Sequence, residues 1–222
     1  MASHAEVLSQ TTFFADAPEA VLNAVARTAT ERLLVRGNTL FSEGDQPDAL
    51  YVVLTGRIAI VIDNKPLDHR ETVVALMEPG DLFGELAMLD NGPRSASARA
   101  IETASVIQVN YSEVLPLLNS HPELMWNIVR LLAKRLRTMD EVLSDSVFLD
   151  VTGRTAKRIL ELSNGSDEFT LPVTQEELAG MVGASRERVN KAIASFIRLR
   201  WISQQDRHYK ILDRAHLEQR SR

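Results

Sequence analysis

The middle of the chain consists of short apolar runs separated by glycines. Between Leu33 and about Tyr111, runs rich in β-branched residues, such as ALYVVLTGRIAIVID and SARAIETASVIQVN, alternate with turn residues. The glycines recur at roughly the spacing of a β-hairpin, at Gly37, Gly44, Gly56, Gly80 and Gly92. Short strands with turn signals between them are typical of antiparallel sheets that close on themselves. The pattern therefore predicts an antiparallel β-roll or barrel.

Helical patterns occur before and within this region. Residues 13–34 contain Pro18 at a helix start, followed by apolar residues at helical spacing. The segment GDLFGELAMLD interrupts the strands, and its apolar residues fit one short helix: Leu82, Phe83, Leu86 and Leu89. We therefore expect a short leading helical region and one helix inserted into the roll.

A much longer helix is predicted from about His121. Its apolar positions alternate in steps of four and three, the spacing of a coiled-coil seam. They are Met125, Val129, Leu132, Leu136, Met139 and Leu143, and Ser146 continues the same spacing. The flanking charged residues are expected to keep the other faces in water: Arg130, Lys134, Arg135, Arg137, Asp140 and Glu141. Such a stripe could pack on the roll of its own chain, but a long narrow seam fits a second copy better. The sequence thus favours a homodimer through residues 121–147.

Charge divides the chain into an acidic front and a basic back. The net charge is −5, but residues 1–150 carry 12 Lys and Arg against 21 Asp and Glu, while residues 151–222 carry 13 against 9. This asymmetry predicts two domains with different partners, the basic one a candidate for phosphate backbones, although an ordinary solvated face is the alternative. Between them, DSVFLDVTGR is interpreted as a strand that ends the long helix, with Asp150 or Thr152 capping the next one.

The basic part contains a two-helix pattern. In TQEELAGMVGASRERVNKAIASFIRLR, Thr174 can cap the first helix, with Glu177 at the capping-box position, and Ser185 can cap the second. Gly183 permits the positive φ that the intervening turn needs. Packing of the apolar faces leaves polar residues exposed on the first turns of the second helix: Arg186, Glu187, Asn190 and Lys191.

These exposed residue types suit base edges in a major groove. Arginine can fork onto guanine and glutamate can accept from cytosine. The alternative is a helical hairpin with a charged outer face, but capping, turn and basic face together favour DNA binding. The tail WISQQDRHYKILDRAHLEQ predicts two short strands around a turn at Asp206, like a wing. The expected fold is α+β: a roll domain at 1–120, a dimerisation helix at 121–147, a hinge at 148–152 and a winged helix-turn-helix at 153–222.

Composition excludes several classes of site. The chain has no cysteine, which excludes disulfides, thiolate metal sites and cysteine-bound clusters. Its five histidines are scattered without metal-ligand spacing, so no metal is expected and any effector should be organic. No apolar run reaches the length of a membrane span, and MASHAEVLSQ lacks the layout of a signal peptide. We therefore expect a cytoplasmic protein that does not contact membranes.

The order of these features resembles bacterial transcription factors of the cyclic-AMP receptor protein and fumarate–nitrate regulator superfamily. The resemblance extends from about residue 10 to 215. FGELAMLDNGPRSASA resembles the phosphate-binding cassette of cyclic-nucleotide domains, and FLDVTGR resembles the hinge of the cyclic-AMP receptor branch. VGASRERVNKAIASF resembles the recognition helix of actinobacterial members.

The resemblance implies a cyclic-nucleotide site built on the cassette. Glu85 would accept from the ribose 2′-OH, while Arg94 and Ser95 would bind the cyclic phosphate. Backbone N–H groups of Gly84 and Glu85, beside Leu86, would add donors. The alternative is a salt bridge between Arg94 and Glu85 with no ligand.

The base end of that site departs from the family. Met139 stands where cyclic-AMP receptors usually place a threonine that bonds the adenine amino group, and Asp140 stands where serine is common. Methionine can pack on a purine but cannot make that hydrogen bond, and it also fits the seam as plain core. The expected ligand is cyclic AMP, with cyclic GMP as a second candidate.

At the DNA end, Arg186 and Glu187 match the family residues that read a G·C pair, and Lys191 stands where an Arg or Lys reads further along. Ser185 and Thr174 could donate to phosphates, and Asn190 lies on the same face. The implied target is a palindrome of TGTGA-like half-sites contacted by both subunits.

The implied mechanism is ligand-controlled DNA binding, with rotation about residues 148–152 and RNA polymerase as a further partner. Three alternatives remain open. They are a regulator that needs no ligand or a different one, a nucleotide sensor that docks a protein, and an enzyme on a cupin-like barrel. The last is least favoured because no nucleophile has a nearby base.

Overall fold

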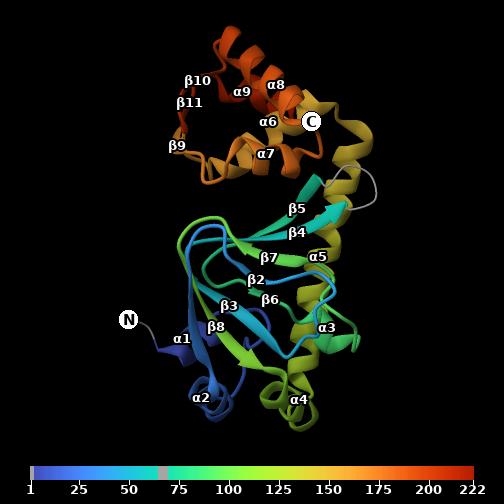
Figure 1. The fold of residues 1–222 in the computed structure, drawn as a ribbon. Coiled ribbons are helices and arrows are strands. Elements are labelled where there is room, and N and C mark those ends of the chain that lie inside the picture. Colours follow the sequence, from blue (N-terminus) through green and yellow to red (C-terminus); the bar gives the residue numbers. More distant parts are fainter. Residues whose placement is uncertain (1–2, 65–69) are drawn as a thin grey trace. The chain divides into compact units, whose positions relative to one another are not determined.

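The structure is a computed structural model that describes residues 3–64 and 70–222 (Figure 1). By its internal contacts the chain divides into two compact units, Met1–Arg137 and Thr138–Arg222. The division falls within the long helix α5 (Glu123–Phe148), so that the segment interpreted as a hinge, 148–152, lies in the second unit.

The first unit contains the predicted antiparallel roll. In its described residues, one four-stranded sheet has the order β1 (Thr30–Leu34), β8 (Ala104–Asn110), β3 (Ala49–Thr55) and β6 (Leu82–Phe83). The other has the order β2 (Thr39–Phe41), β7 (Ser97–Ala100), β4 (Ile58–Asn64) and β5 (Arg70–Met77). All paired strands are antiparallel. Side chains from both sheets, including Tyr51, Ile58 and Phe83, form the core inside the roll.

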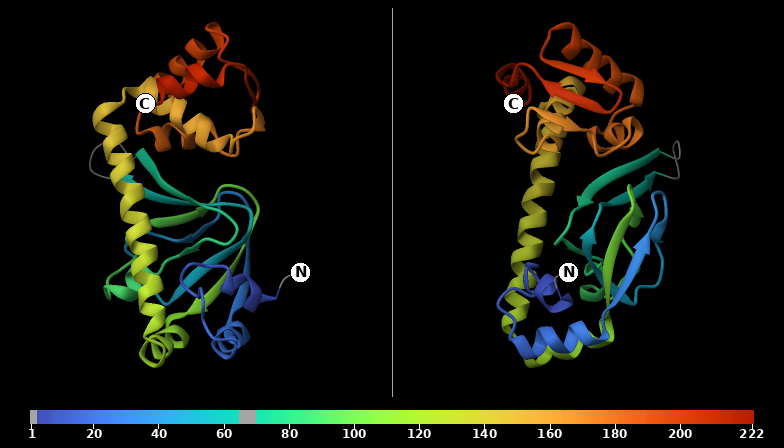
Figure 2. Two further views of the ribbon diagram at one scale, coloured as in Figure 1. Left: turned by 180° about the vertical axis from the view of Figure 1, so that it is seen from behind. Right: turned by 90° about the vertical axis from the view of Figure 1, so that its left-hand side faces the viewer.

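Helices cover the outer face of the first sheet. The alternation of side chains along β3 turns Tyr51 and Val53 into the roll and Leu50 and Val52 outward, against the helices. This second core is built from α1 (His4–Ser9), α2 (Glu19–Thr28), α4 (Tyr111–Ser120) and the first part of α5. Helices α1, α2 and α4 gather at one end of the roll (Figure 2). Pro18 precedes the first residue of α2, as predicted.

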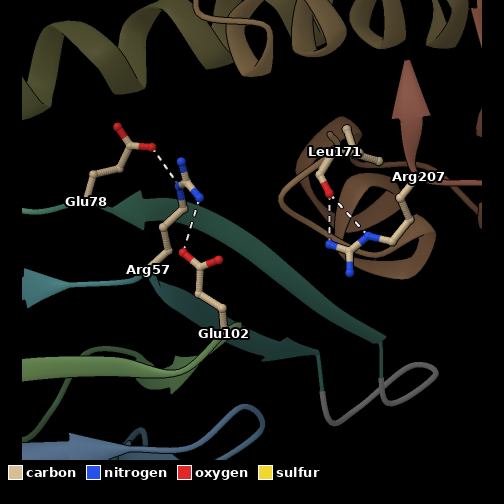
Figure 3. A network of polar contacts seen from close by, with 5 residues as sticks. All are labelled: Arg57, Glu78, Glu102, Leu171 and Arg207. Atoms are coloured by element: carbon tan, nitrogen blue, oxygen red, sulfur yellow. Dashed lines mark hydrogen bonds and ion pairs between the residues drawn. The ribbon is translucent and has the colours of Figure 1, made fainter. Parts of the chain in front are cut away.

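Arg57 forms two ion pairs with residues on other connections of the roll. Arg57 follows the turn after β3, and its Nε lies 2.8 Å from Glu78 Oε1 while its Nη1 lies 3.2 Å from Glu102 Oε1 (Figure 3). These groups are partly exposed, so the ion pairs contribute little to stability.

The inserted helix is shorter than predicted. Leu82 and Phe83 belong to strand β6, where they pair with Val52 and Tyr51, and only Leu86–Leu89 form helix α3. The two elements are separated by Gly84, whose φ of +83° cannot continue a helix. The prediction of one helix that includes Leu82 and Phe83 was therefore wrong.

The second unit is a winged helix-turn-helix. After α5 it contains α6 (Val151–Leu162), β9 (Glu168–Thr170), α7 (Gln175–Val182) and α8 (Arg186–Arg198). The predicted wing strands are β10 (Ile202–Gln205) and β11 (His208–Ile211), which form a three-stranded sheet with β9 in the order β10-β11-β9. Helix α9 (Arg214–Arg220) follows.

The segment DSVFLDVTGR was wrongly predicted as a strand. Helix α5 continues to Phe148, and α6 begins at Val151 after two connecting residues. Of the two candidate caps for α6, Asp150 is the one used, because its side chain accepts from the Gly153 N–H at 2.8 Å. The helical periodicity of α5 outweighs the β-propensity of Val147 and Phe148.

Candidate functional site

The cassette residues of the first unit lie around the β6–α3 connection. Glu85 is fully buried at the N-cap of α3, and Arg94 is buried on the segment before β7. Leu86 and Ser95 are exposed next to them. Gly84 has a φ of +83°, which favours glycine, and a Cβ atom there would lie 2.8 Å from Arg94 Nη1, so a larger residue would displace the guanidinium.

Glu85 forms an ion pair with an arginine of α5. Arg135 Nη1 contacts Glu85 Oε1, and Arg135 Nη2 donates to the Leu82 carbonyl at 2.6 Å. Burial raises the pKa of the Glu85 carboxyl, and the positive charge of Arg135 opposes that shift. The second carboxyl oxygen, Glu85 Oε2, is buried without a hydrogen-bond partner.

Arg94 is held by the backbone and by aromatic rings. Its Nη1 donates to the Gly84 carbonyl at 2.8 Å and its Nη2 to the Ala49 carbonyl at 2.6 Å. The guanidinium carbon lies 4.2 Å from the centre of the Phe41 ring, a cation–π distance. Arg94 Nε is buried without a partner.

Sequence reasoning missed two residues of this cluster. Arg135 was expected to keep a face of the long helix in water, but it pairs with the buried Glu85. Tyr111 Oη accepts from Arg94 Nη1 at 2.9 Å and donates to the Gly84 carbonyl. The salt bridge considered between Arg94 and Glu85 is replaced by these partners. A buried carboxylate needs a cation as partner, so the nearby arginines of the long helix were candidates, and Arg135 is one of them. No feature of the sequence around Tyr111 indicated that it contacts the cassette.

The predicted base-contacting residues lie in the second unit. Met139 and Asp140 are on α5, and both side chains are exposed.

The helix-turn-helix has the predicted caps. The Thr174 hydroxyl accepts from the Glu177 N–H at 3.1 Å and donates to the Glu177 carboxylate at 2.9 Å, which engages its proton. Gly183 has a φ of +66°, and Ser185 caps α8 by accepting from the Arg188 N–H. Buried apolar residues join α7 and α8: Leu178, Val182, Val189, Ile193 and Phe196.

The first turns of α8 expose the predicted polar residues, Arg186, Glu187, Asn190 and Lys191. Glu187 and Lys191 form an ion pair of 2.7 Å, which lowers the pKa of Glu187. A surface hollow of about 450 Å³ is bordered by Arg186, the start of α7 and the wing turn at Asp206. Arg207 on that turn donates to the Leu171 carbonyl from Nε and Nη2, at 3.2 and 2.8 Å (Figure 3).

Residues 3–64 and 70–222 contain neither a membrane-spanning helix nor a cluster of metal-binding side chains. None of their helices has the length and apolar character needed to cross a membrane. No cluster of three or more His, Cys, Asp or Glu in this part of the chain could hold a metal ion.

Comparison with known proteins identifies both units. Residues 31–121 match the sequence model of the cyclic nucleotide-binding domain, and residues 153–220 match that of the Crp-like helix-turn-helix domain. A Mycobacterium tuberculosis protein named CRP-like cAMP-activated global transcriptional regulator is 34% identical, covering 98% of this chain and 99% of the relative. The Salmonella typhimurium cAMP-activated global transcriptional regulator CRP is 30% identical, covering 70% and 77%.

A solved structure agrees with this relation. The catabolite activator protein of Thermus thermophilus is 29% identical and has a TM-score of 0.54, covering 95% of this chain and 98% of that one. The relatives are named as transcriptional regulators and not as enzymes. The chain therefore belongs to the CRP/FNR family of bacterial transcription regulators, with a cyclic nucleotide-binding domain followed by a DNA-binding helix-turn-helix.

Proposed function

We propose that the protein is a homodimeric, sequence-specific DNA-binding regulator controlled by cyclic AMP. The observation that carries the ligand part is the pair of buried, unpartnered atoms Glu85 Oε2 and Arg94 Nε. A buried polar atom without a hydrogen-bond partner destabilises the folded state, so a ligand that forms a hydrogen bond with each of these atoms would be stabilised in the site. A cyclic nucleotide supplies both, since a ribose hydroxyl can donate to the carboxylate and a phosphate oxygen can accept from Nε.

The neighbouring residues extend this assignment. Ser95 is exposed beside Arg94 and can donate to the same phosphate, while Leu86 can cover the sugar. Gly84 and Glu85 would present backbone N–H groups, and Met139 and Asp140 would meet the base. Relatives named as cAMP-activated support cyclic AMP as the ligand.

The ligand assignment is tested by calorimetric titration of nucleotide-stripped protein with cyclic AMP, with cyclic GMP as competitor. We expect saturable binding at one site per chain, and its loss in Arg94→Ala and Glu85→Ala. Arg57→Ala is the matched control, because Arg57 is a partly exposed arginine of the same roll whose ion partners are Glu78 and Glu102. Unchanged affinity in both site variants would overturn the assignment.

The DNA part of the proposal assigns base reading to α8. Arg186 would bind guanine, Glu187 would accept from cytosine, and Lys191 would read further along a TGTGA-like half-site, with Asn190 on the same face. Thr174 and Ser185 would lie against phosphates. Two copies, paired through residues 121–147, would contact a palindrome, and the ligand would rotate the helix-turn-helix regions, residues 153–222, about residues 148–152. RNA polymerase would be a further partner.

Gel shifts with palindromic and random DNA test this assignment. Arg186→Ala should weaken specific binding by about 1–3 kcal/mol and reduce discrimination at one base pair. Arg198→Ala is the control, since Arg198 is an exposed arginine in the last turn of the same helix. Equal loss for specific and random DNA in Arg186→Ala would show that Arg186 contacts phosphate instead.

A second candidate is a regulator of the same family that binds DNA without ligand or with another effector. It is favoured by Met139, whose thioether cannot make the adenine hydrogen bond. The titration separates the two candidates. If cyclic AMP gives no binding heat, with or without cyclic GMP as competitor, and nucleotide-free protein still shifts DNA in a gel, the second candidate is supported.

A further inference from the structure

One phenol group touches both ends of the cassette. Tyr111 is the first residue of α4, is 9% exposed, and is fixed by its backbone N–H, which donates to the Asp48 carbonyl at 2.8 Å. Its hydroxyl donates to the carbonyl of Gly84 and accepts from Arg94 Nη1 at 2.9 Å. The side chain therefore links Arg94, which carries one unpartnered atom of the proposed site, to Gly84, the residue before Glu85, which carries the other.

The hydrogen bonds of Arg94 show what this contact achieves. A guanidinium has five N–H donors in one plane. Nη1 has two acceptors, Tyr111 and Gly84, and Nη2 has the Ala49 carbonyl. Stacking on Phe41 fixes the plane of the group. With both Nη1 hydrogens engaged, the guanidinium is held in one orientation, in which Nε is the nitrogen left without a partner.

We propose that Tyr111 is a positioning residue of the nucleotide site, whose hydroxyl holds Arg94 so that Nε is directed to the phosphate. This inference rests on the proposed function. It assigns Tyr111 no contact with the ligand, because both of its hydrogen-bond partners belong to the protein. Because Tyr111 already restricts the orientation of the Arg94 side chain, less conformational entropy is lost when the phosphate binds.

The protonation state of Tyr111 suits this role. Burial raises the pKa of the phenol to about 12, so the hydroxyl stays neutral near pH 7 and keeps the proton that it donates to the Gly84 carbonyl. A group that acts as donor and acceptor at once can link a carbonyl to a guanidinium, which phenylalanine cannot do.

Titration of Tyr111→Phe with cyclic AMP tests the proposal. The ring is kept, so we expect a folded protein whose affinity is about tenfold lower, the size of one lost hydrogen bond to a charged group. Tyr209→Phe is the matched control, because it removes a buried hydroxyl that bonds Gln175 in the second unit. Wild-type affinity in Tyr111→Phe would overturn the proposal while leaving the site assignment intact. Absence of binding by the wild-type protein would overturn both.

A double-mutant cycle distinguishes positioning from general support of the fold. Arg94→Lys keeps the charge but lacks Nη1, so the effect of Tyr111→Phe should disappear in that background. The same tenfold effect with and without Arg94→Lys would mean that Tyr111 only supports the core, and would overturn the positioning role.

Discussion

Glu85 carries a fully buried carboxyl group in the first unit. This carboxyl forms an ion pair with Arg135, which itself is partly exposed, while the charge of Arg94 acts on it more weakly. Taking a carboxylate out of water destabilises the folded state unless it is paired, and loss of one partner of such a pair leaves an uncompensated charge. The ion pair with Arg135 is thus required for an ionised Glu85 in the cassette, before any ligand binds.

Arg135→Ala should therefore destabilise the protein by about 1–3 kcal/mol near neutral pH. Because burial already raises the pKa of Glu85 above its ordinary 4.5, folding favours the protonated form, and the stability contributed by this group falls as pH rises through the raised pKa. Removing Arg135 raises that pKa further. The difference in unfolding free energy between wild type and variant should be small at acidic pH and grow toward neutrality.

Urea unfolding at several pH values measures this difference. Arg137→Ala, an exposed arginine of the same helix, is the control and should show no such trend. If the difference in unfolding free energy between wild type and Arg135→Ala were the same at every pH, ionisation of Glu85 would not be the cause of the destabilisation.

At the level of elements, Arg154 ties three helices of the second unit together. From α6, its Nη1 donates to the Leu149 carbonyl just beyond the end of α5 at 2.8 Å, and its Nε donates to the Val182 carbonyl at the end of α7 at 2.9 Å. Carbonyls at helix C-termini lack intrahelical donors, and a cation is favourable there. Lys157 adds an ion pair of 2.6 Å with Asp145 of α5.

Arg154→Ala should lower the unfolding free energy by about 1–2 kcal/mol and weaken DNA binding, while cyclic AMP affinity stays at the wild-type value. Arg158→Ala is the matched control, since Arg158 lies one turn later on α6 and pairs with Glu161 of the same helix. Thermal unfolding and gel shifts measure the effects. Equal behaviour of the two variants would show that the carbonyl contacts do not stabilise the unit.

The turn between α7 and α8 depends on one backbone conformation. Gly183 has a φ of +66°, and nothing lies within 4 Å of an added Cβ, so a substitution there meets conformational strain without a clash. Gly183→Ala should lower the unfolding free energy by about 1 kcal/mol, and Gly183→Asn by less, because asparagine tolerates the left-handed region. Thermal unfolding that ranks Asn below Ala would contradict this explanation.

For the whole molecule, the periodic parts were predictable from the sequence and the contacts between distant residues were not. The roll, α5 and the helix-turn-helix follow from local spacing, caps and turn glycines. The short run at Leu82 fits a helix or a strand equally well, and pairing with β3 decides it. The ion pair between Glu85 and Arg135 joins residues 50 positions apart, so it depends on how the roll packs against α5.

The proposed dimer follows from the surface of α5. Leu132 packs on the helical core of its own unit, but other seam residues remain exposed, with Leu136 at 60%, Met139 at 67% and Leu143 at 64%. Burying such side chains contributes about 1.5–3 kcal/mol each, and a second α5 offers the same apolar positions. A protein with Leu136→Glu and Leu143→Glu should therefore sediment as a monomer.

The same variant tests whether the palindrome requires two copies. Each chain supplies one α8, so the monomer should lose affinity for the full palindrome and keep wild-type affinity for a single half-site. Leu33→Glu is the control, because Leu33 is 73% exposed on β1 and is not one of the seam residues of α5. A double variant that remains dimeric would place the interface elsewhere. A monomer with undiminished affinity for the palindrome would show that one chain reads the site alone.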